Sequence, residues 1–161
     1  MALYSGGNRN ATAPTQTAMT TTAKTMIELS AVTATLKRGR LWEYKVGLDA
    51  APNATDCPYV VDVVRITAVG TGVASVGNPI NPADAVSGHL NKINDTVEPT
   101  VTSNSQLDMM ALNQRASQRW VAFGPDECLV WPATNVNGLA IRFLSPTYTG
   151  TAAVDVKYED M

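Results

Sequence analysis

Residues 59–67, with the sequence YVVDVVRIT, decide the fold class because they form the most strongly β-prone stretch of the chain. Val and Ile branch at Cβ, so they pack well on a pleated sheet and lose side-chain freedom in a helix. The stretch therefore predicts a strand, and its neighbours on both sides can be tested for the same pattern.

Three further stretches place an apolar residue at every second position, namely residues 27–31, 41–48 and 152–159. A period of two is typical of a half-buried strand. Strand-like runs also occupy 117–123, 128–131 and 138–144, and the first two are expected to form a hairpin around residues 124–127. Residues 69–76 predict a short edge strand, and 97–101 and 106–112 are extended with a weaker pattern.

The connections between these strands carry turn residues. Residues 37–40, KRGR, predict a turn in which Gly39 takes a positive φ. Residues 81–86 predict a short helical turn capped by Asn81, with Pro82 as its first helical residue. Residues 91–95 are expected to be a loop.

Seven to nine short strands with closely spaced turns and no long helical window favour an antiparallel β-sandwich. Eight strands in two sheets is the natural count, which predicts a jelly roll. A chain of 161 residues suits one domain and can bury enough surface to fold without disulfides or metals. We therefore expect an all-β domain over residues 24–161.

Residues 1–23 differ from the rest, since they are mostly Gly, Asn, Ala, Thr and Ser and lack a periodic apolar pattern. Such a segment buries too little surface to offset its ordering entropy alone. We expect an extended N-terminal arm that lies on a neighbouring molecule. The residues expected to contact a partner are Tyr4, Asn8, Arg9, Pro14 and Met19.

Charge and composition argue against several classes of function. Only 16% of residues are charged and the net charge is −2. The main basic cluster is residues 37–40, and it is too small to form the basic face that nucleic-acid binding requires. No run approaches the length of a membrane span and the first ten residues lack a signal-peptide core, so we expect neither a membrane partner nor export by a signal peptide.

The sequence shows no pattern typical of a catalytic, cofactor or metal site. His89 is the one histidine and is expected to be an exposed loop residue next to Ser87, without a nucleophile motif. Cys57 and Cys128 have no metal or redox spacing and are expected to be small buried residues, with a disulfide as the alternative. Residues 70–72, GTG, lack the remainder of a phosphate-binding motif. We expect no enzyme activity and no cofactor.

Carboxylates and tryptophans leave other possibilities open. Glu98, Asp126 and Glu127 could supply a carboxylate pair for sugar hydrolysis, although the sequence does not place them together. The three tryptophans, at 42, 120 and 131, are expected to pack in the core, with an exposed stacking platform or a protein interface as the alternative.

The C-terminal three quarters of the chain, residues 41–161, resembles the small capsid cement (decoration) proteins of tailed bacteriophages. The resemblance rests on LNQRA at 112–116, RWVA at 119–122, WPAT at 131–134 and NGL at 137–139. It extends to NP at 78–79, NPAD at 81–84, EPT at 98–100, YTG at 148–150 and VKYE at 156–159. It is one of pattern and carries no catalytic signature.

The resemblance implies a β-sandwich or jelly-roll body, trimeric in many members, that sits on the outer capsid surface and clamps the major capsid protein. We therefore expect a virion structural protein made in the host bacterial cytoplasm, with the arm as its tether. The alternative is a carbohydrate- or receptor-binding β-sandwich of a phage tail or fibre, which would need an exposed Trp or Tyr beside polar loop residues.

Overall fold

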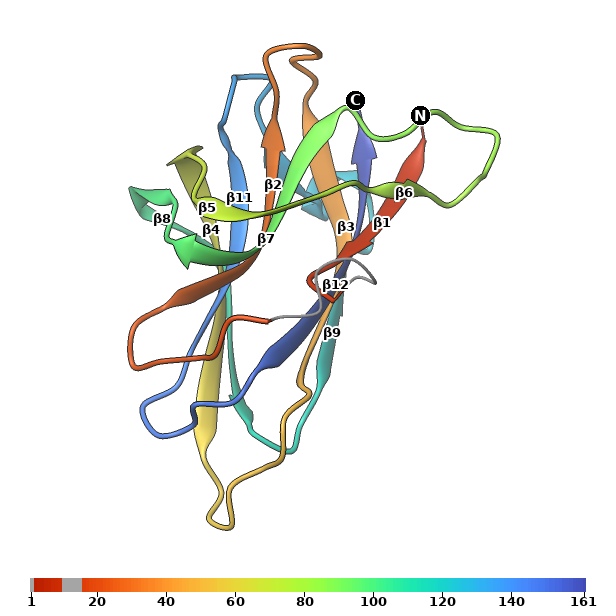
Figure 1. Ribbon diagram of the computed structural model, residues 1–161. Helices are drawn as coiled ribbons and strands as arrows, with labels where there is room; N and C mark the ends of the chain where they lie inside the picture. The colour runs from red at the N-terminus through yellow and green to blue at the C-terminus, as the bar shows by residue number, and fades with distance from the viewer. Residues whose placement is uncertain (1, 10–15) are drawn as a thin grey trace.

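The structure is a computed structural model that describes residues 2–9 and 16–161, and strands dominate it (Figure 1). The strands are β1 (Leu3–Gly7), β2 (Lys24–Ala31), β3 (Gly39–Leu48), β4 (Pro58–Ala68), β5 (Thr71–Ser75), β6 (Asn78–Pro79), β7 (His89–Val97), β8 (Thr100–Asn113), β9 (Gln118–Val121), β10 (Leu129–Trp131), β11 (Gly138–Leu144) and β12 (Ala152–Asp160). One short 3-10 turn, η1 (Pro125–Glu127), lies between β9 and β10.

The strands form two sheets whose named pairs are all antiparallel. The β3 sheet has the order β10-β3-β12-β1-β6, and β9 also pairs with β3. The β4 sheet has the order β5-β7-β2-β11-β4-β8. The predicted all-β sandwich is confirmed, with more strands in each sheet than the four of a minimal jelly roll.

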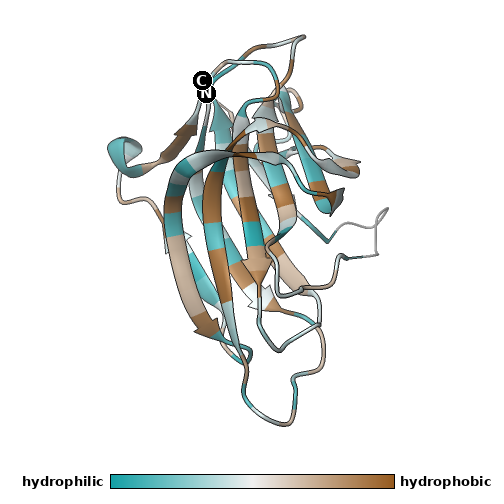
Figure 2. Ribbon diagram, turned by 90° about the vertical axis from the view of Figure 1, so that its left-hand side faces the viewer, coloured by the Kyte–Doolittle hydropathy of each residue, from teal (hydrophilic) through white to brown (hydrophobic). Residues whose placement is uncertain are grey.

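The core lies between the sheets because their strands alternate in hydropathy, which Figure 2 shows as brown and teal bands. The stretch 59–67 forms most of β4, and its Tyr59, Val61 and Val63 are at most 1% exposed. Tyr59 stacks on Phe143 of β11, with ring centroids 6.0 Å apart. From the facing sheet, Tyr44, Val156 and Tyr158 complete the same apolar cluster.

The N-terminal segment differs from the expected arm. Residues 3–7 form β1, which pairs with β12 on one side and β6 on the other, so they are an interior strand of the β3 sheet. Tyr4 is 3% exposed and stacks on Tyr158 at 5.5 Å. The strand sequence, LYSGG, is too short and too rich in glycine to show a recognisable alternation. The main partner of β1 is β12, at the other end of the sequence.

Residues 16–23 also lie on the body of their own chain. The backbone N–H of Met19 donates to Gly150 O at 3.0 Å, and the Gln16 side chain donates to Ala152 O at 2.9 Å. Met19 is fully buried in the core cluster. The described parts of the segment therefore complete the sandwich, whereas Pro14 lies outside the described residues.

Two predictions about the strands were wrong. β9 and β10 do not pair with each other but lie along the same side of β3, because η1 directs the chain onward at the point where a hairpin would turn it back. Residues 91–95 lie inside β7. The predicted turn after Asn81 is present over residues 81–84, and Asn81 Oδ1 accepts from the Ala83 N–H, but the turn does not continue as a helix to residue 86.

Gly39 has no positive φ, since it is the first residue of β3. A glycine is required there for another reason: a Cβ would overlap the indole ring of Trp131, which is fully buried beside it. The left-handed residue of this connection is Leu36, with a φ of 38°.

Both chain ends lie at one end of the sandwich, drawn at the top of Figure 1. We call this end the terminal end. It also carries the connections β2–β3 (residues 32–38), β6–β7 (80–88) and β10–β11 (132–137).

Candidate interaction surfaces

The residues predicted from sequence as partner contacts are mostly buried. Tyr4, Asn8 and Met19 are 3%, 0% and 0% exposed, so none of them can meet another molecule in this structure. Asn8 is a structural link: its side-chain amide donates to Asn94 Oδ1 and Ala152 O, and its Oδ1 accepts from the Val154 N–H. Arg9 is exposed and pairs with Asp49 at 3.3 Å.

The loops at the terminal end are held together by hydrogen bonds. Thr35 Oγ1 donates to Gly88 O at 2.5 Å, which joins connection 32–38 to connection 80–88. The Val136 N–H donates to Ala31 O at 2.9 Å, which joins connection 132–137 to the end of β2. The three loops thus form one fixed surface on rigid strands.

Two aliphatic residues at the terminal end have left-handed backbones. The φ angles are 38° for Leu36 and 59° for Val136. This region is unfavourable for most residues other than Gly, Asn and Asp, and most so for a β-branched residue. Residues held in such conformations cost on the order of 1–3 kcal/mol and cluster at functional sites.

The same surface exposes large apolar side chains. Leu36, Ile80 and Val86 are 46%, 50% and 68% exposed, one at the strained position and two in connection 80–88. A shallow hollow of about 560 Å³, lined by Arg38, Arg65, Val130 and residues 132–134, lies at the β10 edge of the β3 sheet. Leu36 is notable because glycine would relieve its backbone strain, yet a leucine side chain is presented to solvent.

His89 lies directly beneath this surface and is buried, so the prediction of an exposed loop imidazole was wrong. Its ring packs edge-on against Trp131, with centroids 4.9 Å apart. Nδ1 accepts from Trp131 Nε1 at 3.4 Å, and Nε2 lies 3.1 Å from Asp160 Oδ1. Burial lowers the pKa of His89 against the opposing effect of Asp160, so the ring is neutral at pH 7.

Ser87, His89 and Asp160 do not form a nucleophilic triad. The Ser87 hydroxyl donates to Asp160 Oδ1 at 3.2 Å and accepts from the His89 backbone N–H at 3.1 Å. Both ring nitrogens of His89 face other groups, which leaves no base to take a proton from Ser87. Asp160 instead fixes the loop, since it also accepts from the Gly88 N–H at 2.9 Å.

The outer face of the β3 sheet carries a group of ion pairs around Glu43. Its carboxylate lies 2.6 Å from Arg119, 3.0 Å from Lys157 and 3.3 Å from Lys45. The hydrogen bond from Arg119 is the largest cause that lowers the pKa of Glu43, to about 2, although burial opposes it. Arg40 pairs with Glu159 at the next position along the face.

An apolar groove lies beside these ion pairs. Leu3, Trp42 and Val121 supply its apolar walls, Glu43, Lys157 and Glu159 form its rim, and its volume is about 450 Å³. The Arg40 guanidinium sits 5.1 Å from the centre of a Trp42 ring. We call this the Trp42 groove.

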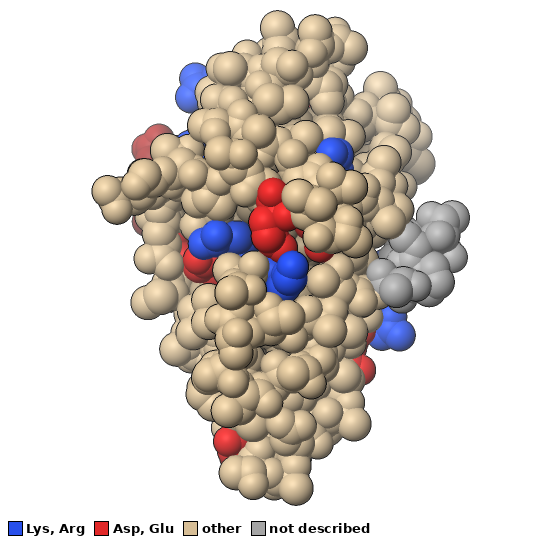
Figure 3. Space-filling model, turned by 60° about the vertical axis from the view of Figure 1, so that its left-hand side comes forward, with Lys and Arg blue, Asp and Glu red and all other residues tan. Residues whose placement is uncertain are grey.

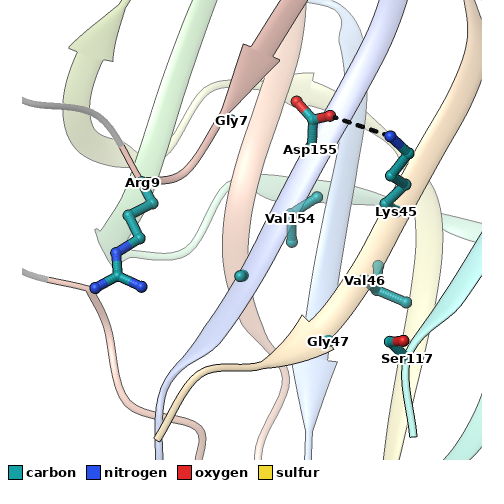
Figure 4. Close-up of a pocket in the computed structure, with 9 residues that line it drawn as sticks. Gly7, Arg9, Lys45, Val46, Gly47, Ser117, Val154 and Asp155 are labelled. Atoms are coloured by element: carbon teal, nitrogen blue, oxygen red, sulfur yellow. Dashed lines mark ion pairs between the residues drawn. The ribbon is translucent and has the colours of Figure 1, made fainter.

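A second hollow, of about 360 Å³, occupies the same face farther along the strands (Figure 4). Gly7, Gly47 and Val154 contribute to its floor, and Lys45 reaches across to Asp155 at 4.0 Å. Its polar groups are two cations, one carboxylate and one hydroxyl, without a base next to the hydroxyl. The hollow offers shape but no arrangement for chemistry.

Two carboxyl groups are buried together in the β4 sheet. Glu28 of β2 and Asp95 of β7 are both 0% exposed. If both carboxyl groups were ionised, neither oxygen of Asp95 would accept a hydrogen bond. A proton held between Asp95 and Glu28 supplies the missing hydrogen bond. Burial, and then the charge of Glu28, raise the pKa of Asp95 to about 8, so the pair holds one proton at pH 7.

This pair explains the GTG stretch at residues 70–72. The backbone of the β5 edge lies directly over the carboxyl groups, and a Cβ at Gly70 or Gly72 would overlap the Asp95 oxygens. The Gly70 N–H donates to Glu28 Oε1 at 2.8 Å, and Lys92 Nζ donates to Gly70 O at 2.6 Å. The role of these two glycines is therefore to let the backbone lie over a buried polar group. They do not form a phosphate-binding loop.

Glu98, Asp126 and Glu127 do not meet as a carboxylate pair. Glu98 Oε2 accepts from the N–H and the hydroxyl of Thr25 in β2, at 3.0 and 2.6 Å. Asp126 and Glu127 lie in η1 next to β9 and β10 in the other sheet. The geometry for sugar hydrolysis is thus not assembled from these residues.

Cys57 and Cys128 are free and buried, as expected of small core residues. Among residues 2–9 and 16–161, no three His, Cys, Asp or Glu side chains converge as metal ligands. The same part of the chain contains no helix with the length and hydropathy to span a bilayer. Figure 3 shows a face on which charged side chains gather in one small area amid a largely uncharged surface.

Sequence reasoning missed the terminal end because its signal is conformational. A left-handed φ at Leu36 or Val136 leaves no pattern in composition, since neither residue is typical of that conformation. The one signal in the sequence for the Trp42 groove was the alternative that a tryptophan is exposed, since Trp42 is half-buried and lines the groove. Trp131 lies in the core as expected, and Trp120, although half-buried, also packs against the core through Tyr44.

No protein-family model matches this sequence, and no curated protein matches it.

Proposed function

We propose that this protein is a virion structural protein of the cement or decoration type, which binds the outer surface of an assembled capsid and stabilises it. The proposal combines the resemblance of residues 41–161 with a rigid sandwich that presents a fixed, partly apolar end. Its binding surface is the terminal end, in place of the N-terminal arm, because the described part of that arm is built into the sandwich.

Leu36 is the observation that carries this choice of surface. An exposed leucine with a φ of 38° costs backbone energy and gains little from its own fold. Such a residue is favoured where its side chain is buried by a partner. Ile80 and Val86 are further exposed apolar side chains on connection 80–88, which Thr35 joins to the loop of Leu36. Apolar side chains at the centre of an interface supply much of its energy.

A carbohydrate-binding function has weaker support. Trp42 is half-buried at a groove, as a stacking platform would require. However, Leu3 and Val121 line the same groove, and the Arg40 guanidinium stacks on the indole. The proposal of a sugar-binding protein would gain from hits on a glycan array, and an array without hits would count against it.

Leu36→Gly separates folding from binding. Glycine accepts the left-handed backbone, so we expect the variant to be as stable as the native protein or up to about 1 kcal/mol more stable in urea. We expect it to bind capsids that lack the protein at least tenfold more weakly, measured by co-sedimentation. Native protein should also raise the temperature at which those capsids disrupt.

Met109→Gly is the matched control, because Met109 is 59% exposed on β8, away from the terminal end. It should bind capsids as the native protein does, even if it costs strand stability. Native binding by Leu36→Gly would overturn the assignment of the surface. A native protein that neither binds nor protects the capsids would overturn the function.

A further inference from the structure

Phe123 is the most exposed large apolar side chain of the described residues, at 97%, and no residue among 2–9 and 16–161 covers it. It follows β9, where exposure alternates: Val121 is 41% exposed, Ala122 is 7% exposed and Phe123 points out again. The Ala122 N–H still donates to Trp42 O at 2.9 Å, which keeps this segment in register with β3. Phe123 therefore projects on the same side as Val121, from the outer face of the β3 sheet.

The base of Phe123 is fixed rather than loose. Its backbone N–H donates to the Glu127 carboxylate at 3.2 Å, and η1, which begins at Pro125, closes the loop. The Glu127 N–H donates to Gly124 O at 3.1 Å. A phenyl group held in water on a rigid base loses little further freedom when it binds, so it is well suited to fill a pocket.

The Trp42 groove, on the same face, has the properties of such a pocket. Its walls are Leu3, Trp42 and Val121, and its volume of about 450 Å³ exceeds that of a phenyl group. Val121 belongs to the groove and lies two residues before Phe123, so the projecting ring and the groove are neighbours on one surface. The ring is nevertheless exposed, so it does not fill the groove of its own chain.

The loop that carries Phe123 and the Trp42 groove also have complementary charges. The loop that carries Phe123 contributes Asp126 and Glu127 and no basic residue in its turn. Around the groove, Arg40, Arg119 and Lys157 lie against Glu43 and Glu159, which is three cations to two carboxylates. A net positive area on a chain with a net charge of −2 favours the approach of an acidic loop.

We propose that two copies of this chain pack through the outer faces of their β3 sheets, with Phe123 of each copy in the Trp42 groove of the other. A face that bears both a projection and a matching groove is complementary to itself when a two-fold axis lies in the plane of contact. Each contact then forms twice, as in other isologous interfaces. The proposal gives two copies, whereas many members of the family that residues 41–161 resemble are trimeric.

Phe123→Ser tests the contact, because a residue that touches nothing in its own fold can be changed without unfolding it. Native protein should have twice the chain mass of 17.1 kDa in light scattering at tens of micromolar. Phe123→Ser should raise the dimer dissociation constant at least tenfold, as should Val121→Arg from the groove side. Met109→Ser, at an exposed apolar position in the other sheet, should leave the dissociation constant unchanged.

Site-specific cross-linking tests which surfaces meet. A mixture of Phe123→Cys and Leu3→Cys proteins should give a mixed disulfide dimer under mild oxidation, whereas Met109→Cys mixed with Leu3→Cys should not. Native protein is the blank, since Cys57 and Cys128 are buried. A monomer at every concentration, a trimer, or a dimer that Phe123→Ser leaves intact would each overturn the proposal.

Discussion

At the scale of single residues, the carboxyl pair of Glu28 and Asp95 sets how stability depends on pH. Asp95 has a pKa of about 8 in the fold and an ordinary value of 3.8, so the native state keeps a proton that the unfolded chain loses between these values. The stability contributed by that proton is complete below about pH 4 and is lost as the pH rises to 8.

Asp95→Asn should therefore stabilise the protein at pH 8 and not at pH 4. The amide can donate to Glu28 without a proton from solvent, and it removes a like charge from a buried site. We expect an increase of roughly 1–3 kcal/mol in the free energy of unfolding at pH 8, measured by urea titration. Asp126→Asn, on the exposed turn η1, is the control, and equal effects of Asp95→Asn at both pH values would contradict this account.

At the scale of elements, β1 shows that the N-terminal segment is part of the fold. Tyr4→Ala should lower the free energy of unfolding by about 3 kcal/mol or more, because it removes a buried aromatic ring stacked on Tyr158. Arg9→Ala, which removes a surface ion pair next to the same strand, should change it by less than about 1 kcal/mol. Thermal or urea unfolding measures both, and similar small effects would mean that β1 is dispensable.

The elements also show where sequence reasoning succeeded and where it could not. β4 and β12 were predictable because their β-branched or alternating residues reflect burial directly. β1 was not, since LYSGG is stabilised by strands far away in the sequence rather than by its own composition. The hairpin expected from 117–131 failed for a related reason: strand propensity is local, whereas the choice of β3 as the common partner is a property of the whole sheet.

At the scale of the whole molecule, two surfaces have different tasks in this account. We propose that the terminal end, with the exposed Leu36, Ile80 and Val86, meets the capsid, and that the outer face of the β3 sheet, with the Trp42 groove, meets a second copy. The carboxyl pair in the β4 sheet contributes to neither contact. Leu36 and Phe123 were not identifiable from sequence as contact residues, because an exposed apolar side chain is recognised only once the fold shows what covers it.

An electron cryo-microscopy map of capsids reconstituted with the native protein would show which surface of the sandwich meets the shell. We expect density for the sandwich on the outer shell, with the connections that contain Leu36 and Val86 against the capsid surface and residues 49–57, between β3 and β4, pointing away from it. A shell without added density, or a sandwich attached through another surface with Leu36 in solvent, would contradict this proposal.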